Sequence, residues 1–345
     1  MADLGQFAPE KAVKDGRFDP NHPYVSRVFA NVNLDLGPSH YDFKIWNPQF
    51  GDISRYKLCK WVGSGRYSDV FISLQDDTKK CAIKLLKPVN PDRVRRELKI
   101  LHEVQGNKNI LELWDIIIDG KYGIPGMVTE AVDNSDWRDL FSKFSLEDIK
   151  FYIYSIVKAL AHAHSVGVMH RDVKPLNVLC DMKTRTVKLA DWGLAEFYHP
   201  LHKYSYHVGT VYYKAPEVCL GYPLYDYSID MWAVGVSLLE ALSGRIHVFE
   251  ESSNDVFDSI ANILGGKEIL DWGAKYNVKI SMRKVDRISS MKKVPFESLF
   301  PKSRKEFMDP DGMDLVYKLL VADHKKRLTA EETLAHPFFD SVRDM

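Results

Sequence analysis

Between residues 55 and 90, apolar residues occur in short runs that Gly or Asp interrupts. The runs YKLCKWVGSG, YSDVFISLQDD and KKCAIKLLK are rich in β-branched and aromatic residues, which favour extended backbone. Two similar runs follow further along, ILELWDIIIDG at 110–120 and GIPGMVTEAV at 123–132. The pattern predicts a set of short β-strands in this part of the chain.

A helix is predicted between these strands, over PDRVRRELKILHEVQG at 91–106. Its buried stripe recurs at helical spacing: Val94, Leu98 and Leu101. Asp92 is the expected N-cap. Glu97 lies three residues after Val94 and four before Leu101, so it belongs to the inward flank of the helix.

Beyond residue 132 the spacing of apolar residues becomes mainly helical. SLEDIKFYIYSIVKALAHAHSVG starts with Ser145 and Asp148 at capping-box spacing and ends at Gly167. MWAVGVSLLEAL, at 231–242, is apolar on nearly all sides and predicts a helix buried in the core.

These elements predict an α+β fold with two lobes and a cleft between them. Residues 55–130 form a small antiparallel β-sheet lobe with one long helix, and residues 131–345 form a larger, mainly α-helical lobe. Residues 1–54, rich in Pro, Asn, Asp and Gly, are expected to be extended and partly ordered.

Composition narrows the class of protein. The 345 residues suffice for about two domains, and Lys+Arg and Asp+Glu both number 47. A formal charge of zero argues against binding of nucleic acid or membrane through bulk charge. The spacing of the four cysteines is not that of metal ligands: they are Cys59, Cys81, Cys180 and Cys219. No secretory or lipidation signal is visible. We expect reduced thiols and a location in the cytoplasm and nucleus.

GSGRYSDV, at 63–70, is the first candidate for chemistry. A glycine-rich turn between strands lets backbone N–H groups approach phosphate oxygens. Ser68 stands where a third glycine is usual, and an ordinary hairpin turn is the alternative reading.

Lys84, in CAIK, is the second candidate. A lysine in an apolar strand is costly to bury without a partner, and Glu97 on the following helix offers one. The alternative is a lysine at a strand edge that reaches solvent.

HRDVKPLNVL (170–179) and DWG (191–193) are the third and fourth candidates. Asp172 could accept the proton of an attacking alcohol, and Lys174 could stabilise charge on a transferred phosphoryl group. Asn177 and Asp191 offer oxygen ligands for Mg²⁺. Either motif alone could be a turn capped by an Asp, but all four occur in order and APE follows at 215–217. Together they predict phosphoryl transfer.

In these motifs the chain resembles the eukaryotic protein kinases. Within them it is similar to the casein kinase II catalytic (alpha) subunits of the CMGC group. The likeness runs from Ser26 to Val342 and is carried by SRVFANVN, GSGRYSDVF, HRDVKPLNV, DWGLAEFYHP, YDYSIDMW and DHKKRLTAEETLAHPFF. It implies one kinase domain over about 56–339, with residues 1–54 packed on that core.

The resemblance implies that ATP binds between the lobes. Lys84 would grip the phosphates and pair with Glu97, while Asp191 and Asn177 would hold two Mg²⁺ ions, with Mn²⁺ as a substitute. Ile83 and Leu179 would sandwich the base, behind which Thr129 would be the gatekeeper. The implied nucleotide-binding residues are Val62, Gly63, Ser64, Gly65, Arg66, Tyr67, Ser68, Val70, Ile83, Lys84, Glu97, Thr129, Glu130, Val132, Leu179 and Asp191.

The resemblance also implies regulation and partners. Activity would not need phosphorylation of the activation loop, because residues 26–50 would hold that loop open. The protein would use ATP, or GTP, to phosphorylate Ser or Thr residues that are followed by acidic residues. A regulatory beta subunit would bind the outer sheet of the small lobe, where Leu58 and Phe71 match apolar contact positions. Glu217 and Arg327 would form a buried pair.

Acid-directed recognition is where the chain departs from that family. The candidates for binding acidic substrates are Lys87, Arg93, Arg95, Arg96 and Lys214. Residues at which the family has other side chains are Asn90, Pro91, Asp92, His207 and Val211. The alternatives are therefore a related kinase with less acid-directed specificity, which modification within HKYSYHVGT could switch through Arg171, and a pseudokinase scaffold.

Overall fold

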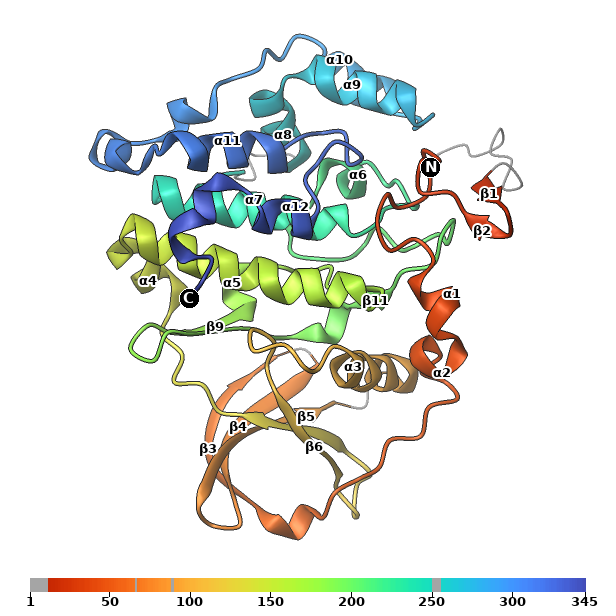
Figure 1. Cartoon of the computed structure of the whole chain (residues 1–345), viewed down its shortest axis with the longest axis vertical. Coiled ribbons are helices and arrows are strands. Elements are labelled where there is room, and N and C mark those ends of the chain that lie inside the picture. Colours follow the sequence, from red (N-terminus) through yellow and green to blue (C-terminus); the bar gives the residue numbers. More distant parts are fainter. Residues whose placement is uncertain (1–11, 66, 88–89, 250–255) are drawn as a thin grey trace.

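The structure is a computed structural model that describes residues 12–65, 67–87, 90–249 and 256–345. A sheet lobe occupies the lower part of Figure 1, and stacked helices form the larger lobe above it. The α+β, two-lobed prediction is confirmed. Within the described ranges, no helix has both the length and the apolar character that a membrane crossing requires.

The small lobe is built on an antiparallel sheet whose strand order is β3-β4-β5-β7-β6. Its strands are β3 (Tyr56–Ser64), β4 (Ser68–Gln75), β5 (Lys79–Leu86), β6 (Leu113–Ile118) and β7 (Pro125–Glu130). Successive side chains of a strand point to opposite faces. Cys81 and Ile83 of β5 therefore pack in a small cluster with Ile117 and Val128, whereas Lys84 points to the other face.

Helix α3 (Pro91–Glu103) packs between this sheet and the large lobe (Figure 1). Its N-cap is Asn90, whose side chain accepts hydrogen bonds from the N–H groups of Asp92 and Arg93. The prediction of Asp92 as N-cap is therefore wrong. Pro91 explains the difference, because proline has no N–H and fits the first helical position, which leaves the residue before it as the cap. Glu97 is buried, as its inward position predicted.

The large lobe consists mainly of helices. Its helices are α4 (Trp137–Lys143), α5 (Leu146–Ser165), α6 (Pro216–Cys219), α7 (Ser228–Ser243), α8 (Val256–Leu264), α9 (Gly266–Lys275), α10 (Met282–Ile288), α11 (Pro310–Leu319) and α12 (Ala330–Leu334). Its short strands are β8 (Val168–Met169), β9 (Val178–Asp181), β10 (Thr186–Leu189) and β11 (Glu196–Phe197). The predicted capping box of Ser145 and Asp148 starts α5, and α7 is buried along most of its length.

The N-terminal segment runs along one side of the molecule, from the large lobe down to the small one (red to orange in Figure 1). It forms β1 (Val13–Lys14), β2 (Arg17–Phe18), α1 (Val32–Leu36) and α2 (Pro38–Tyr41). The amide of Asn33 donates to the carbonyl oxygens of Gly167 and Tyr198, at 2.9 and 2.8 Å. A Cβ on Gly167 would lie 2.4 Å from the Asn33 side chain, so this close approach requires glycine.

Candidate active site

Lys84 joins three elements at the back of the cleft. Its Nζ lies 2.7 Å from Oε1 of Glu97 on α3 and 2.7 Å from Oδ1 of Asp191, which follows β10. Burial by itself lowers the pKa of Lys84, but the charges of Glu97 and Asp191 outweigh it and hold this pKa above its usual value. The lysine is therefore charged and positioned by two carboxylates, and the reading of a strand-edge lysine in solvent is wrong.

Asp191 carries the charge that a cation bound with nucleotide phosphates would need. Burial acts to raise the pKa of its carboxyl, but the charge and hydrogen bond of Lys84 outweigh it and lower this pKa. Since Lys84 uses Oδ1, the second carboxylate oxygen remains for another partner. The side chain is about half exposed to the cleft. A carboxylate with phosphate oxygens is the ligand set that Mg²⁺ favours, so the residues fit this ion.

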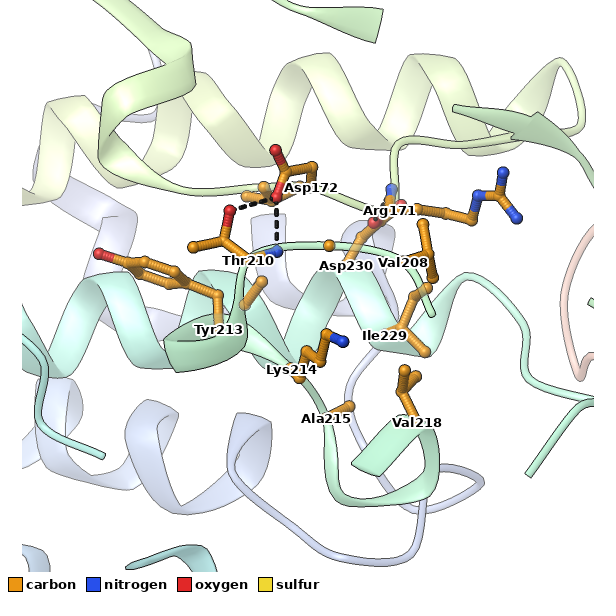
Figure 2. A pocket seen from close by; sticks show the side chains of 13 residues that line it. Arg171, Asp172, Val208, Thr210, Tyr213, Lys214, Ala215, Val218, Ile229 and Asp230 are labelled. Carbon is orange, nitrogen blue, oxygen red and sulfur yellow. Dashed lines mark hydrogen bonds between the residues drawn. The ribbon is translucent and has the colours of Figure 1, made fainter. Parts of the chain in front are cut away.

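Asp172 lies at the centre of a hydrogen-bond network (Figure 2). Its Oδ1 accepts from the backbone N–H of Thr210 at 2.8 Å and from the Thr210 hydroxyl at 2.7 Å. Its Oδ2 accepts from Lys174 Nζ at 2.7 Å and from the Asn177 amide at 3.0 Å. The amide nitrogen of Asn177 also donates to the Asp172 carbonyl oxygen at 2.8 Å, so its amide oxygen is the atom left for a cation.

The backbone next to Asp172 is positioned by hydrogen bonds to Asp230 of α7. Backbone N–H groups of His170 and Arg171 both donate to the carboxylate of Asp230 at 2.8 Å. Burial acts to raise the pKa of Asp230, but its hydrogen bond with His164 and the neighbouring charges lower it. Arg171 has φ of 65°, a left-handed conformation that these bonds help to hold. The loop is thus positioned by a buried, ionised acid.

A cavity of about 350 Å³ opens between the lobes beside these groups. That size suits a small-molecule ligand. Predicted residues that line it are Val62, Ser68, Val70, Lys84, Glu97, Thr129, Glu130, Val132, Asn177, Leu179 and Asp191. Lining residues that sequence reasoning missed are Ile72, Ala82, Leu101, Leu111, Met127, Asn134, Leu176, Ala190 and Trp192.

Ile83 does not contact this cavity, and its prediction as a base-sandwiching residue is wrong. Its side chain is buried on the opposite face of the sheet, where it packs with Val128. Ala82 lines the cavity instead, two residues from Lys84 and on the same face of β5. The two-residue period of a strand was the signal that would have identified Ala82.

The glycine-rich turn between β3 and β4 borders the cavity through the flanking residues Val62 and Ser68. Its predicted residues outside the cavity lining are Gly63, Ser64, Gly65 and Tyr67, and Arg66 lies outside the described residues. Lys87 stabilises the turn, because its Nζ donates to Ser64 Oγ and to the Gly65 carbonyl oxygen, both at 2.9 Å.

Some of the basic residues predicted to bind acidic substrates instead contact other residues of the protein. Arg96 pairs with Glu196 at 2.7 Å, and the guanidinium of Arg93 lies 3.5 Å from the ring centre of Tyr67. Arg95 is exposed on α3. The structure therefore leaves Arg95 as the most open of these cations, and it gives Arg96 a role in joining α3 to β11.

A second, smaller pocket lies directly beside Asp172 (Figure 2). Its apolar lining residues are Val173, Val208, Ala215, Val218, Ile229 and Ala233. Lys214 also lines it, and in Figure 2 its side chain extends toward these residues. Val211 is 42% exposed, and His207 is also exposed. The surface next to Asp172 thus combines apolar side chains with Lys214 and with the polar residues Arg171, Thr210 and Asp230.

The family comparison agrees with this arrangement. A family model described as protein kinase domain matches residues 56–339, which is most of the chain. The match spans both lobes and every residue of the Lys84 and Asp172 networks.

Proposed function

Because the chain belongs to the protein kinase family, and is thus a phosphotransferase that uses ATP on protein substrates, we propose that it is a constitutively active serine/threonine kinase. We further propose that it is a catalytic subunit of the casein kinase II type and acts on hydroxyls in acidic contexts. The observation that carries the proposal is that unmodified side chains already complete both networks, Lys84 with Glu97 and Asp191, and Asp172 with Thr210 and Lys174.

The reaction follows from these positions. The substrate hydroxyl oxygen forms a bond to the γ-phosphorus, the bond from that phosphorus to the bridging oxygen of ADP breaks, and Asp172 receives the hydroxyl proton. Lys174 and Lys84 stabilise the negative charge on the phosphate oxygens. Asp191 and the amide oxygen of Asn177 would hold Mg²⁺, which neutralises phosphate charge when it is bound with ATP.

The contacts of two residues, Arg171 and Tyr204, favour activity without phosphorylation. Arg171 is the residue that could pair with a phosphate group on a modified residue nearby. It already donates to the Leu194 carbonyl oxygen at 2.7 Å and to the Tyr225 hydroxyl at 3.1 Å, and it lies 3.4 Å from Glu196. Tyr204 in the same segment is buried, and its hydroxyl donates to the Phe197 carbonyl oxygen at 3.0 Å. Arg171 therefore already has partners.

The N-terminal segment contacts the activation loop, which lies between DWG (191–193) and APE (215–217), and so supports the proposal that this loop is held open. Its Ser26 N–H donates to the Tyr198 hydroxyl at 2.7 Å. Its His40 lies 2.8 Å from Glu103 at the end of α3 and 2.8 Å from the Val166 carbonyl oxygen after α5. These contacts join the segment to both lobes, which supports the proposal that residues 26–50 keep the kinase in its active arrangement.

The preference for residues next to the phosphorylated Ser or Thr separates the proposed function from a second candidate function. Lys214 and Arg95 support acidic substrates, by charge complementarity. The pocket beside Asp172 includes Val208, Val218 and Ile229 in its lining, and these apolar side chains instead favour a small apolar residue next to the phosphorylated Ser or Thr. This related kinase of less acid-directed specificity is the alternative.

The test uses protein made in bacteria and treated with a phosphatase. Peptides that carry Glu after the acceptor Ser are compared with matched Ala, Leu and Pro peptides, first with ATP and then with GTP, and Asp172→Asn serves as the inactive control. Faster turnover of the Glu peptides supports the acidic preference. A preference for Leu or Pro supports the alternative, and absence of turnover by the dephosphorylated protein contradicts constitutive activity.

A partner for the outer sheet is part of the same proposal. The large apolar residues Leu58 and Trp61 of β3 are at least half exposed, and Phe71 on β4, which pairs with Trp61, is half-buried. This surface supports binding of a regulatory beta subunit. Mixing with that subunit and measuring mass by light scattering tests it, with Leu58→Asp as the variant expected to stay monomeric.

A further inference from the structure

A basic groove lies next to Glu130, the last residue of β7, and outside the nucleotide cavity. It has a volume of about 580 Å³ and is formed by α5, the β9–β10 hairpin and the loop before β6. Four cationic side chains line it: Lys108, Lys158, Arg185 and Lys188. Phe151 and Val187 add apolar surface. Figure 1 shows α5 and β9 near the C-terminal end, whose Met345 also contacts the groove.

Two of the four cations are neutralised by carboxylates. Lys188 pairs with Glu130 at 2.7 Å, and Glu130 lines both this groove and the nucleotide cavity. Arg185 pairs with Asp148 at 2.8 Å, and its guanidinium lies 4.1 Å from the ring centre of Phe151. These two cations therefore add little net charge to the groove.

Lys108 and Lys158 differ from them. Among the residues that the structure describes, neither has an Asp or Glu carboxylate within 4.0 Å. Lys108 Nζ donates to the main-chain oxygen of Met345 at 3.3 Å, and Lys158 Nζ lies 4.6 Å from the ring centre of Tyr154. Partial burial and the charge of Lys108 lower the pKa of Lys158. The two lysines thus repel each other, and an anion between them would relieve that repulsion.

We propose that this groove binds an acidic peptide segment of a protein substrate or partner, whose carboxylates pair with Lys108 and Lys158. The volume exceeds that of a single small anion, and the apolar contribution of Phe151 and Val187 suits the stem of a peptide side chain. The groove is distinct from the cavity that holds the nucleotide, so a peptide can bind here while ATP is bound. This site goes beyond the proposed function and does not depend on acidic preference at Asp172.

Direct binding is the first test. A fluorescein-labelled peptide of six glutamates is titrated with the full chain, and anisotropy is followed at low and high salt. The peptide should bind about 5- to 30-fold more weakly to the double variant Lys108→Ala, Lys158→Ala. The control double variant Lys302→Ala, Lys305→Ala removes the same charge from an exposed segment and should bind as the wild type does. Equal affinity of both double variants, or equal binding of a six-glutamine peptide to the wild type, overturns the proposal.

Kinetics separate this site from the catalytic cleft. Two substrates share one phosphorylation site, and only one carries a distant acidic segment on a flexible linker. For the substrate with the segment, the double variant Lys108→Ala, Lys158→Ala should raise KM by about 5- to 30-fold, the factor expected for the loss of peptide affinity, with kcat unchanged. The substrate without the segment should show no change. Loss of kcat on both substrates would contradict a docking role. Acidic preference at the cleft is measured separately, on the short peptides. That proposal can therefore be contradicted while binding of an acidic segment in the groove is supported, and the groove can be contradicted while acidic preference is supported.

Discussion

Replacing Thr210 by valine tests whether the network around Asp172 positions the catalytic base. The Thr210 hydroxyl donates to Asp172 Oδ1 at 2.7 Å and accepts from Lys174 Nζ at 2.6 Å. Valine keeps the shape of the side chain but removes both contacts. The backbone N–H of residue 210 and the amide of Asn177 still bind the carboxylate, so the perturbation is confined to one hydroxyl.

The expected magnitude follows from the charge of the acceptor. A hydrogen bond to an ionised group contributes about 1.5–3 kcal/mol. If the reaction needs the carboxylate in this orientation, Thr210→Val should lower kcat by about 10- to 150-fold. Asp172 is only 7% exposed, so water can hardly replace the lost donor. Thr210→Ser keeps the hydroxyl and should stay within about threefold of the wild type.

A single-turnover assay with labelled ATP and a saturating peptide measures the chemical step, and urea unfolding checks that both variants are folded. Thr210→Val within twofold of the wild type would refute the positioning role. So would Thr210→Ser losing as much activity as Thr210→Val, since the hydroxyl would then be irrelevant.

Three further predictions concern the cleft and the core. Ala82→Leu should fill part of the cavity and raise the KM for ATP at least tenfold, whereas Ile83→Val should leave that KM unchanged and cost about 0.5–1.5 kcal/mol of stability; the reverse result would restore Ile83 to the cavity. Burial raises the pKa of Glu240 from 4.5 to about 7, so the folded state keeps a proton that the unfolded state loses in this window. The free energy of unfolding should therefore fall by up to ~3 kcal/mol as pH rises from 4.5 to 7, and Glu240→Gln should remove that part of the pH slope measured by urea melts. Glu217→Ala should cost about 3–5 kcal/mol in the same melts, because it leaves the fully buried Arg327 without its partner at 2.8 Å, and a loss below about 1 kcal/mol would contradict this.

The sequence by itself determined those features that depend on neighbours along the chain. The cap of Ser145 and Asp148, the buried helix at 231–242 and the inward position of Glu97 follow from helical spacing, because side chains three and four residues apart share a face. Local chemistry also accounts for the two predictions that were wrong: Pro91 selects Asn90 as the cap, and alternation from Lys84 selects Ala82 rather than Ile83.

Only the tertiary structure decided which distant residues meet. Arg96 finds Glu196 one hundred positions away, and the loop of Asp172 rests on Asp230 of α7. The basic groove likewise brings together Lys108 and Lys158 from different elements, although neither belongs to a motif. Such contacts depend on how helices and strands pack against one another, and packing arises from burial summed over the whole core, which no local pattern encodes.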